Sequence, residues 1–72
     1  MLTVVKTGEK LKRYRRGAAL TQIELAERAG LAQSTVTMIE TGQISEPRPS
    51  TLKALAEVLE LKPIDLLDDP RE

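Results

Sequence analysis

Residues 22–40 read QIELAERAGLAQSTVTMIE, and the central helices of the fold can be inferred from them. Thr21 stands before it and Glu24 lies three residues further on, which is the pattern of a capping box. In a capping box the Thr21 hydroxyl accepts from the backbone amide of Glu24, and the Glu24 carboxylate accepts from the backbone amide of Thr21. A helix is therefore expected to begin at Gln22. Gly30 supplies the positive φ that ends this helix, and a second helix is predicted over 33–40.

The connection between these two helices is so short that they must cross closely. Ala26 is small enough to lie at the crossing, and apolar residues stand at the offsets that a shared core requires. These core positions are Leu25, Ala29, Leu31, Val36 and Ile39. So many requirements met together indicate a helix-turn-helix more strongly than any lone motif does.

The flanking sequence predicts three more short helices. One begins at Thr7 or Gly8 and ends near 17–19, one has Pro49 in its first turn, and a last one covers 64–67 after Pro63. Their inward-facing residues are Leu11, Tyr14, Arg15 and Ala18 in the first of these helices, and Leu52, Leu55, Ala56 and Leu59 in the second.

These elements predict an all-α fold, a compact bundle of five short helices that contains the helix-turn-helix. The length fits one domain, 1–72. Within it we expect an N-terminal arm at 1–6, which has some extended character, a helical core at 7–68 and a short tail at 69–72.

The amino-acid composition argues against several classes of function. The 72 residues include neither Cys nor His, so we expect no enzyme, no metal site and no cofactor. Net charge is zero, but residues 1–28 hold seven basic and three acidic side chains, whereas residues 50–72 hold three basic and six acidic ones. The N-terminal part of the chain is therefore suited to bind phosphate, and the acidic C-terminal part is not. No apolar run approaches the ~18 residues of a membrane helix, and we expect a cytoplasmic protein.

From about Gly8 to Leu67 the sequence resembles the Cro and lambda-repressor-like (XRE-type) helix-turn-helix family. The likeness lies in residues 20–30, 34–42, 48–52 and 63–67. It implies a lambda-repressor-like DNA-binding fold and a bacterial or phage-encoded transcriptional regulator, associated with the nucleoid when bound. Such a protein is expected to be a repressor that binds a palindromic double-stranded DNA operator as a homodimer, with the second helix of the motif in the major groove.

The resemblance implies a role for each site residue separately, by its place in the matching segments. The resemblance implies a DNA-binding surface made of Gln22, Gln33, Ser34, Thr35, Thr37, Met38, Arg48 and Thr51. Gln22 matches a residue that contacts phosphate and braces the reading helix, and the Gln33 amide suits adenine. Ser34 and Thr37 can donate or accept, so they are expected to add affinity more than sequence choice.

The other positions leave alternatives open. Thr35 suits a phosphate or a base, and Met38 suits a thymine methyl or partial burial beside the next helix. Arg48 and the first amides of the helix after it suit a second phosphate. Arg15 and Glu40 match a structural pair between the first and third helices.

Departures from the family pattern affect the turns. Ala32 stands where a Ser or Thr cap is usual, Ala19 and Glu60 stand where a helix-ending Gly is common, and Glu46 puts a negative charge near the expected phosphate contact. Zero net charge, the acidic tail and Glu46 support an alternative function, a protein-interaction module, antitoxin-like or coactivator-like, with weak or no DNA recognition. Its partner would be a protein such as a toxin, or a missing C-terminal domain.

The last helix is too short to bury all its apolar residues. We expect Leu61, Ile64 and Leu67 to form the dimer interface. Val4 and Val5 offer a rival surface, as an arm that packs on its own core or pairs with a partner's arm.

Overall fold

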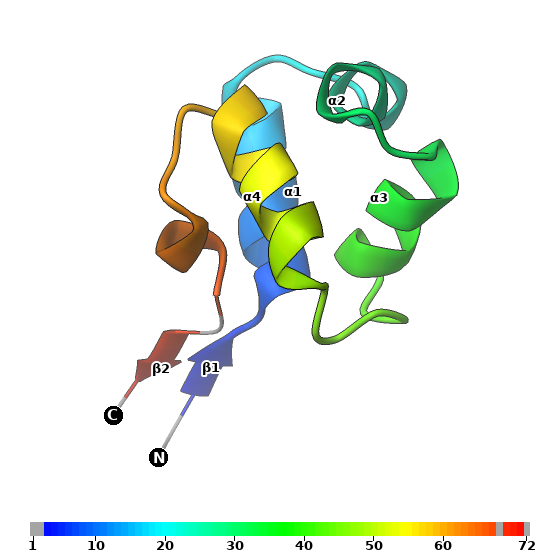
Figure 1. Ribbon diagram of the computed structural model, residues 1–72. Coiled ribbons are helices and arrows are strands. Elements are labelled where there is room, and N and C mark those ends of the chain that lie inside the picture. Colours follow the sequence, from blue (N-terminus) through cyan, green and yellow to red (C-terminus); the bar gives the residue numbers. More distant parts are fainter. Residues whose placement is uncertain (1–2, 68, 72) are drawn as a thin grey trace.

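The computed structural model describes residues 3–67 and 69–71. Within them the chain forms four α-helices, one 3₁₀ helix and two short strands (Figure 1). In chain order these are β1 (Thr3–Val5), α1 (Thr7–Gly17), α2 (Gln22–Ala29), α3 (Gln33–Glu40), α4 (Pro49–Val58), η1 (Pro63–Leu66) and β2 (Asp69–Arg71). The predicted helical class is confirmed, although the fifth helix is a 3₁₀ turn. None of the described helices is long and apolar enough to cross a membrane.

The hydrophobic core lies where all the helices meet. Figure 1 shows α2 and α3 on one side of the molecule and η1 on the other, with α1 and α4 between them. The fully buried large side chains are Leu11, Leu25, Val36, Ile39, Leu55 and Leu66. Every helix therefore contributes to one core, and α2 and α3 cross within it as the helix-turn-helix pattern predicts.

The inward face of α1 differs from the prediction. Tyr14 is 39% exposed and Ala18 is also exposed, whereas Thr7, Gly8, Leu11 and Arg15 are buried. The reason is that the first turn of α1 packs against the end of α3. A methyl group on Gly8 would overlap the carbonyl oxygen of Ile39, so only glycine allows this approach.

The ends of α2 follow from local sequence. The Thr21 hydroxyl accepts from the Glu24 amide at 3.0 Å, and the Thr21 amide donates to the Glu24 carboxylate at 2.9 Å. Hydrogen bonding from the Thr21 amide, assisted by its hydroxyl, lowers the pKa of Glu24. Gly30 ends the helix with a φ of 70°. By contrast, no side chain caps the first turn of α3 at Ala32.

Two strands at the ends of the chain were not expected as a pair. β1 runs antiparallel to β2, with Thr3 opposite Arg71 and Val5 opposite Asp69 (Figure 1). The predicted arm therefore pairs through its backbone with the chain's own tail. Whether Val4 and Val5 pack on the core or meet a partner's arm stays a prediction. Residues 1, 2, 68 and 72, which include the predicted end of the helical core, lie outside the described residues.

Ala19 and Glu60 adopt the left-handed backbone conformation that usually requires glycine, with φ of 59° and 58°. Both follow directly on the end of a helix, where the chain must turn sharply. A side chain in this conformation costs about 1–2 kcal/mol, so the expected strain at these turns is present.

Replacing Ala19 by Gly should stabilise the fold by about 0.5–1 kcal/mol, because relief of the left-handed strain exceeds the added entropy of the unfolded chain. Urea unfolding followed by circular dichroism measures the change. Ala18→Gly is the matched control, since Ala18 has a φ of −88° and gains no relief, and it should destabilise. A loss of stability in Ala19→Gly equal to that of the control would contradict the assignment of strain.

Candidate nucleic-acid interface

Helix α3 presents a polar side to solvent. Val36 and Ile39 point into the core, whereas Gln33 and Ser34 are exposed. At 100° per residue, Ser34 stands opposite the buried side, with Thr37 next to it on one flank and Met38 on the other. Thr37 and Met38 are half-buried, so Met38 is neither fully exposed nor part of the core.

An ion pair joins α1 to the end of α3. Arg15 Nε donates to Glu40 Oε2 at 2.7 Å, and Arg15 Nη2 donates to Glu40 Oε1 at 3.0 Å. Only 11% of the arginine side chain and 2% of the glutamate side chain are exposed. The hydrogen bond from Arg15 to Glu40 raises the pKa of the guanidinium and so favours its charged form. Arg15 Nη1 also donates to the Leu20 carbonyl, which ties the turn before α2 to the same group.

Gln22 extends this network to the surface. Its Nε2 donates to Glu40 Oε1 at 3.1 Å, and its Oε1 accepts from the Thr37 hydroxyl at 2.8 Å. Gln22 thus holds α3 from the first turn of α2. In this structure the Thr37 proton is directed at Gln22, which leaves the hydroxyl to accept from any further partner.

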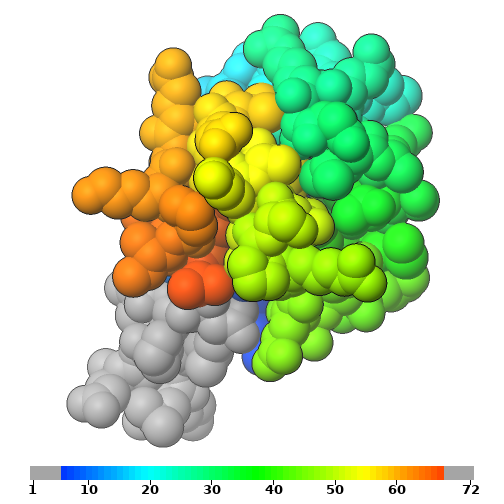
Figure 2. Space-filling model, viewed as in Figure 1, coloured from blue at the N-terminus to red at the C-terminus, as the bar shows by residue number. Residues whose placement is uncertain are grey.

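On the other flank of α3 the loop and the start of α4 enclose a hollow of about 360 Å³. Thr35, Arg48 and Thr51 line it together with Glu46. Arg48 is exposed at the N-terminus of α4, where Pro49 occupies the first turn and no side chain caps the amides. Figure 2 shows a continuous surface from α3 in green, across the loop, to the start of α4 in yellow-green. Three of the predicted DNA-binding residues therefore meet here, with an opposing carboxylate among them.

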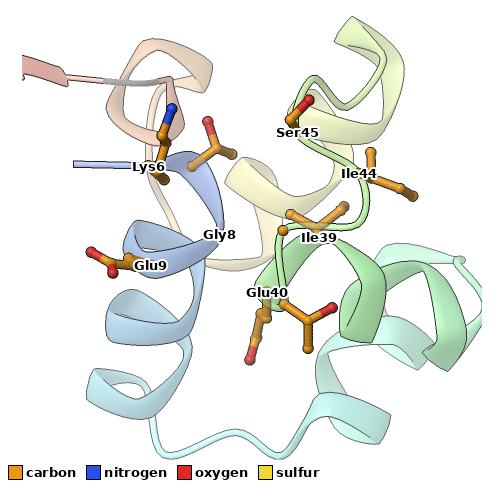
Figure 3. A pocket seen from close by; sticks show the side chains of 10 residues that line it. Lys6, Gly8, Glu9, Ile39, Glu40, Ile44 and Ser45 are labelled. Carbon is orange, nitrogen blue, oxygen red and sulfur yellow. The ribbon is translucent and has the colours of Figure 1, made fainter. Parts of the chain in front are cut away.

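Two features of the site were missed from the sequence. Thr41 is exposed one turn beyond Thr37, and its hydroxyl donates to the Thr37 carbonyl at 2.9 Å. Gly8 lies against the end of α3 near Ile39 and Glu40, beside a hollow of about 400 Å³ (Figure 3). The helical period continued past residue 40 would have indicated Thr41, whereas no local signal marks Gly8 as a contact.

The residues expected at the dimer interface divide into two groups. Leu61 is half-buried and packs against the core, whereas Ile64 is 67% exposed and Leu67 is 45% exposed. In Figure 2 the segment that contains η1 lies across the molecule from α3. Helices α1 and α4 lie between η1 and α3 (Figure 1).

The fold and the site together define a helix-turn-helix protein in which Gln22 and Glu40 hold α3, the second helix of the motif, in place. The helix-turn-helix family matches residues 11–67. The chain belongs to this family, in its XRE-type branch.

Individual relatives agree with this assignment. RghRB of Bacillus subtilis (strain 168), described as an uncharacterized HTH-type transcriptional regulator, is 39% identical over 54 residues, which cover 75% of this chain. The HTH-type transcriptional regulator SinR of the same organism is 34% identical over 65 residues, or 90% of this chain. The match spans 39% of RghRB and 59% of SinR.

Among solved structures, the master regulator for biofilm formation SinR in complex with DNA superposes with a TM-score of 0.81 at 32% identity. The superposition covers 83% of this chain and 95% of the SinR chain in that structure.

Replacing Glu40 by Ala should cost about 3–5 kcal/mol, because it leaves the Arg15 guanidinium without its carboxylate partner. A domain of this size has only about 3–5 kcal/mol to lose, so the variant should be largely unfolded at 25 °C by circular dichroism. The double variant Arg15→Met, Glu40→Leu should regain most of that stability, since no unpaired charge remains buried. A double variant no more stable than Glu40→Ala would show that the charge is not the cause.

Proposed function

We propose that the chain is the sequence-specific DNA-binding unit of a transcriptional regulator, with α3 entering the major groove. The observation that carries this proposal is the polar side of α3, Gln33, Ser34 and Thr37, held in one orientation by Gln22 and Glu40. An α-helix with its side chains is ~10–12 Å across, which fits a major groove ~12 Å wide. SinR, a relative with the same fold, is solved in complex with DNA, which supports the proposal.

Roles follow from the chemistry of each group. The Gln33 amide is suited to donate to N7 of adenine and accept from N6, which reads sequence. Arg48 and the uncapped amides of α4 are suited to a backbone phosphate, which positions the protein without reading sequence. Thr51 lines the same hollow as Arg48, and Met38 lies on the flank of α3 that also carries Thr35. The unit acts by binding DNA in the cytoplasm and is not an enzyme.

Regulation follows from dimerisation on a palindromic operator. A single module buries only ~600–1,000 Å² on DNA, so two copies are needed to discriminate a site in a genome. Ile64 and Leu67 supply an exposed apolar surface for the second copy. Repression by occlusion of the promoter is the simplest mechanism.

The second candidate function is a protein-interaction module. Glu46 favours it, because a carboxylate beside Arg48 and Thr51 opposes phosphate. In that case Ile64 and Leu67 receive a different protein, and binding to duplex DNA is weak for every sequence.

Replacing Gln33 by Ala should weaken binding to the preferred site by ~1–3 kcal/mol and leave binding to random duplex nearly unchanged, because only a base-edge contact is lost. Fluorescence anisotropy with the selected operator and a scrambled duplex measures both. Arg48→Ala is the contrasting variant: it should weaken both duplexes alike and reduce the salt slope by about one. Equal losses on the two duplexes for Gln33→Ala would assign this residue to phosphate instead.

Replacing Ile64 by Asp should abolish a weak dimer, because it places a charge in the exposed apolar surface. We expect wild type to associate in sedimentation runs only at high concentration, and more strongly on a palindromic operator whose half-sites lie ~34 Å apart. Ile23→Asp is the matched control in the absence of DNA, since Ile23 is 50% exposed on α2. If both variants associated like wild type, the interface would lie elsewhere.

A further inference from the structure

The hydrogen bonds beneath the exposed side of α3 converge on the Glu40 carboxylate. Arg15 donates to Glu40, Gln22 donates to Glu40, and Thr37 donates to Gln22. This series of hydrogen bonds begins at the buried charge of Arg15 and ends at the half-buried hydroxyl of Thr37 at the surface. Each link sets the direction of the next, so the polarity of the last group is fixed by the first.

The orientation of the Gln22 amide is the decisive link. Turning it over would place its oxygen against a Glu40 oxygen, and two acceptors in contact repel each other. The carboxylate therefore selects the arrangement in which the amide nitrogen faces Glu40. The amide oxygen then faces Thr37 and leaves the hydroxyl only the role of donor toward Gln22.

A hydroxyl whose single proton is engaged can only accept from a further partner. Thr37 stands one helical turn after Gln33 and Ser34, on the side of α3 away from Val36 and Ile39. Thr37 is half-buried, so a molecule that covers this side of α3 can reach the residue. A hydroxyl that donates its proton still has lone pairs that can accept. A phosphate oxygen cannot donate to it. In the major groove only the amines N4 of cytosine and N6 of adenine donate.

We propose that Thr37 is a base-reading residue that accepts from an exocyclic amine, and that it selects cytosine or adenine over guanine or thymine at one operator position. The proposal rests on the DNA-binding function proposed above. Gln22 is a positioning residue here, because it acts on the base through Thr37. The keto oxygens of guanine and thymine would face the Thr37 lone pair and are rejected.

The test begins with binding selections from a random duplex library for wild type, Thr37→Val and Thr37→Ser. Wild type and Thr37→Ser should enrich cytosine or adenine at one position of the motif. Thr37→Val should lose that preference while the other positions keep theirs. Gln22→Ala frees the proton of Thr37, so guanine or thymine should become acceptable at the same position.

The second arm removes the amine from the DNA. On the selected operator, adenine is replaced by purine or cytosine by 2-pyrimidinone at that position, whichever base the selection returned. Wild type should lose about two- to tenfold in affinity, and Thr37→Val should lose nothing further. If Thr37→Val does not fold, as judged by circular dichroism, Thr37→Ala takes its place.

The outcomes separate the possibilities. Unchanged base preferences in the valine or alanine variant, with wild type still selecting a motif, overturn the role of Thr37 and leave the proposed function intact. A uniform loss on all duplexes makes Thr37 a phosphate or bracing residue and also overturns it. A wild-type chain that enriches no motif overturns both proposals.

Discussion

The positions of α1, α2 and α3 depend on the hydrogen bonds that the carboxylate of Glu40 accepts. Its two oxygens accept from Arg15 on α1 and from Gln22 on α2, while its own backbone ends α3. A charge that is almost fully withdrawn from water is tolerated only if it is paired and its lone pairs are satisfied. The carboxylate therefore fixes the positions of three helices relative to one another.

Apolar packing alone would leave α3 poorly oriented. This eight-residue helix buries only Val36 and Ile39, and a helix so short is not stable by itself in water. The hydrophobic effect is non-directional, so two buried side chains hold the helix to the core without specifying its orientation as hydrogen bonds do. The hydrogen bonds that Gln22 donates to Glu40 and accepts from Thr37 supply the missing restraint. Stability and orientation thus come from different sides of the same helix.

Local sequence predicted the parts of the fold that local chemistry determines. Thr21 with Glu24 and Gly30 placed the ends of α2, because a cap or a left-handed turn needs particular residues at fixed spacing. Contacts between distant residues were harder. The pairing of Arg15 with Glu40 came from the family resemblance, and the contact of Gly8 with α3 was missed, because a glycine in a first turn carries no sign of what approaches it.

The candidate site was predictable in its residues but not in its polarity. The sequence places Gln33, Ser34 and Thr37 on one side of a helix, and this follows from the helical period. Which way the Thr37 proton points depends on Gln22, a residue of another helix, and therefore needs the three-dimensional contacts. The terminal strands were unpredictable for a similar reason, since three-residue strands more than sixty positions apart leave no pattern.

The pairing of β1 with β2 gives the domain a mechanical property. Because Thr3 lies opposite Arg71, a pull on the two ends separates the strands like a zipper, one hydrogen-bonded rung at a time. Tension applied through both ends is therefore met first by this small ribbon. The helical part of the domain, α3 included, would bear load only after the two strands have separated. The strand pair therefore yields before the surface that Gln22 and Glu40 hold in place.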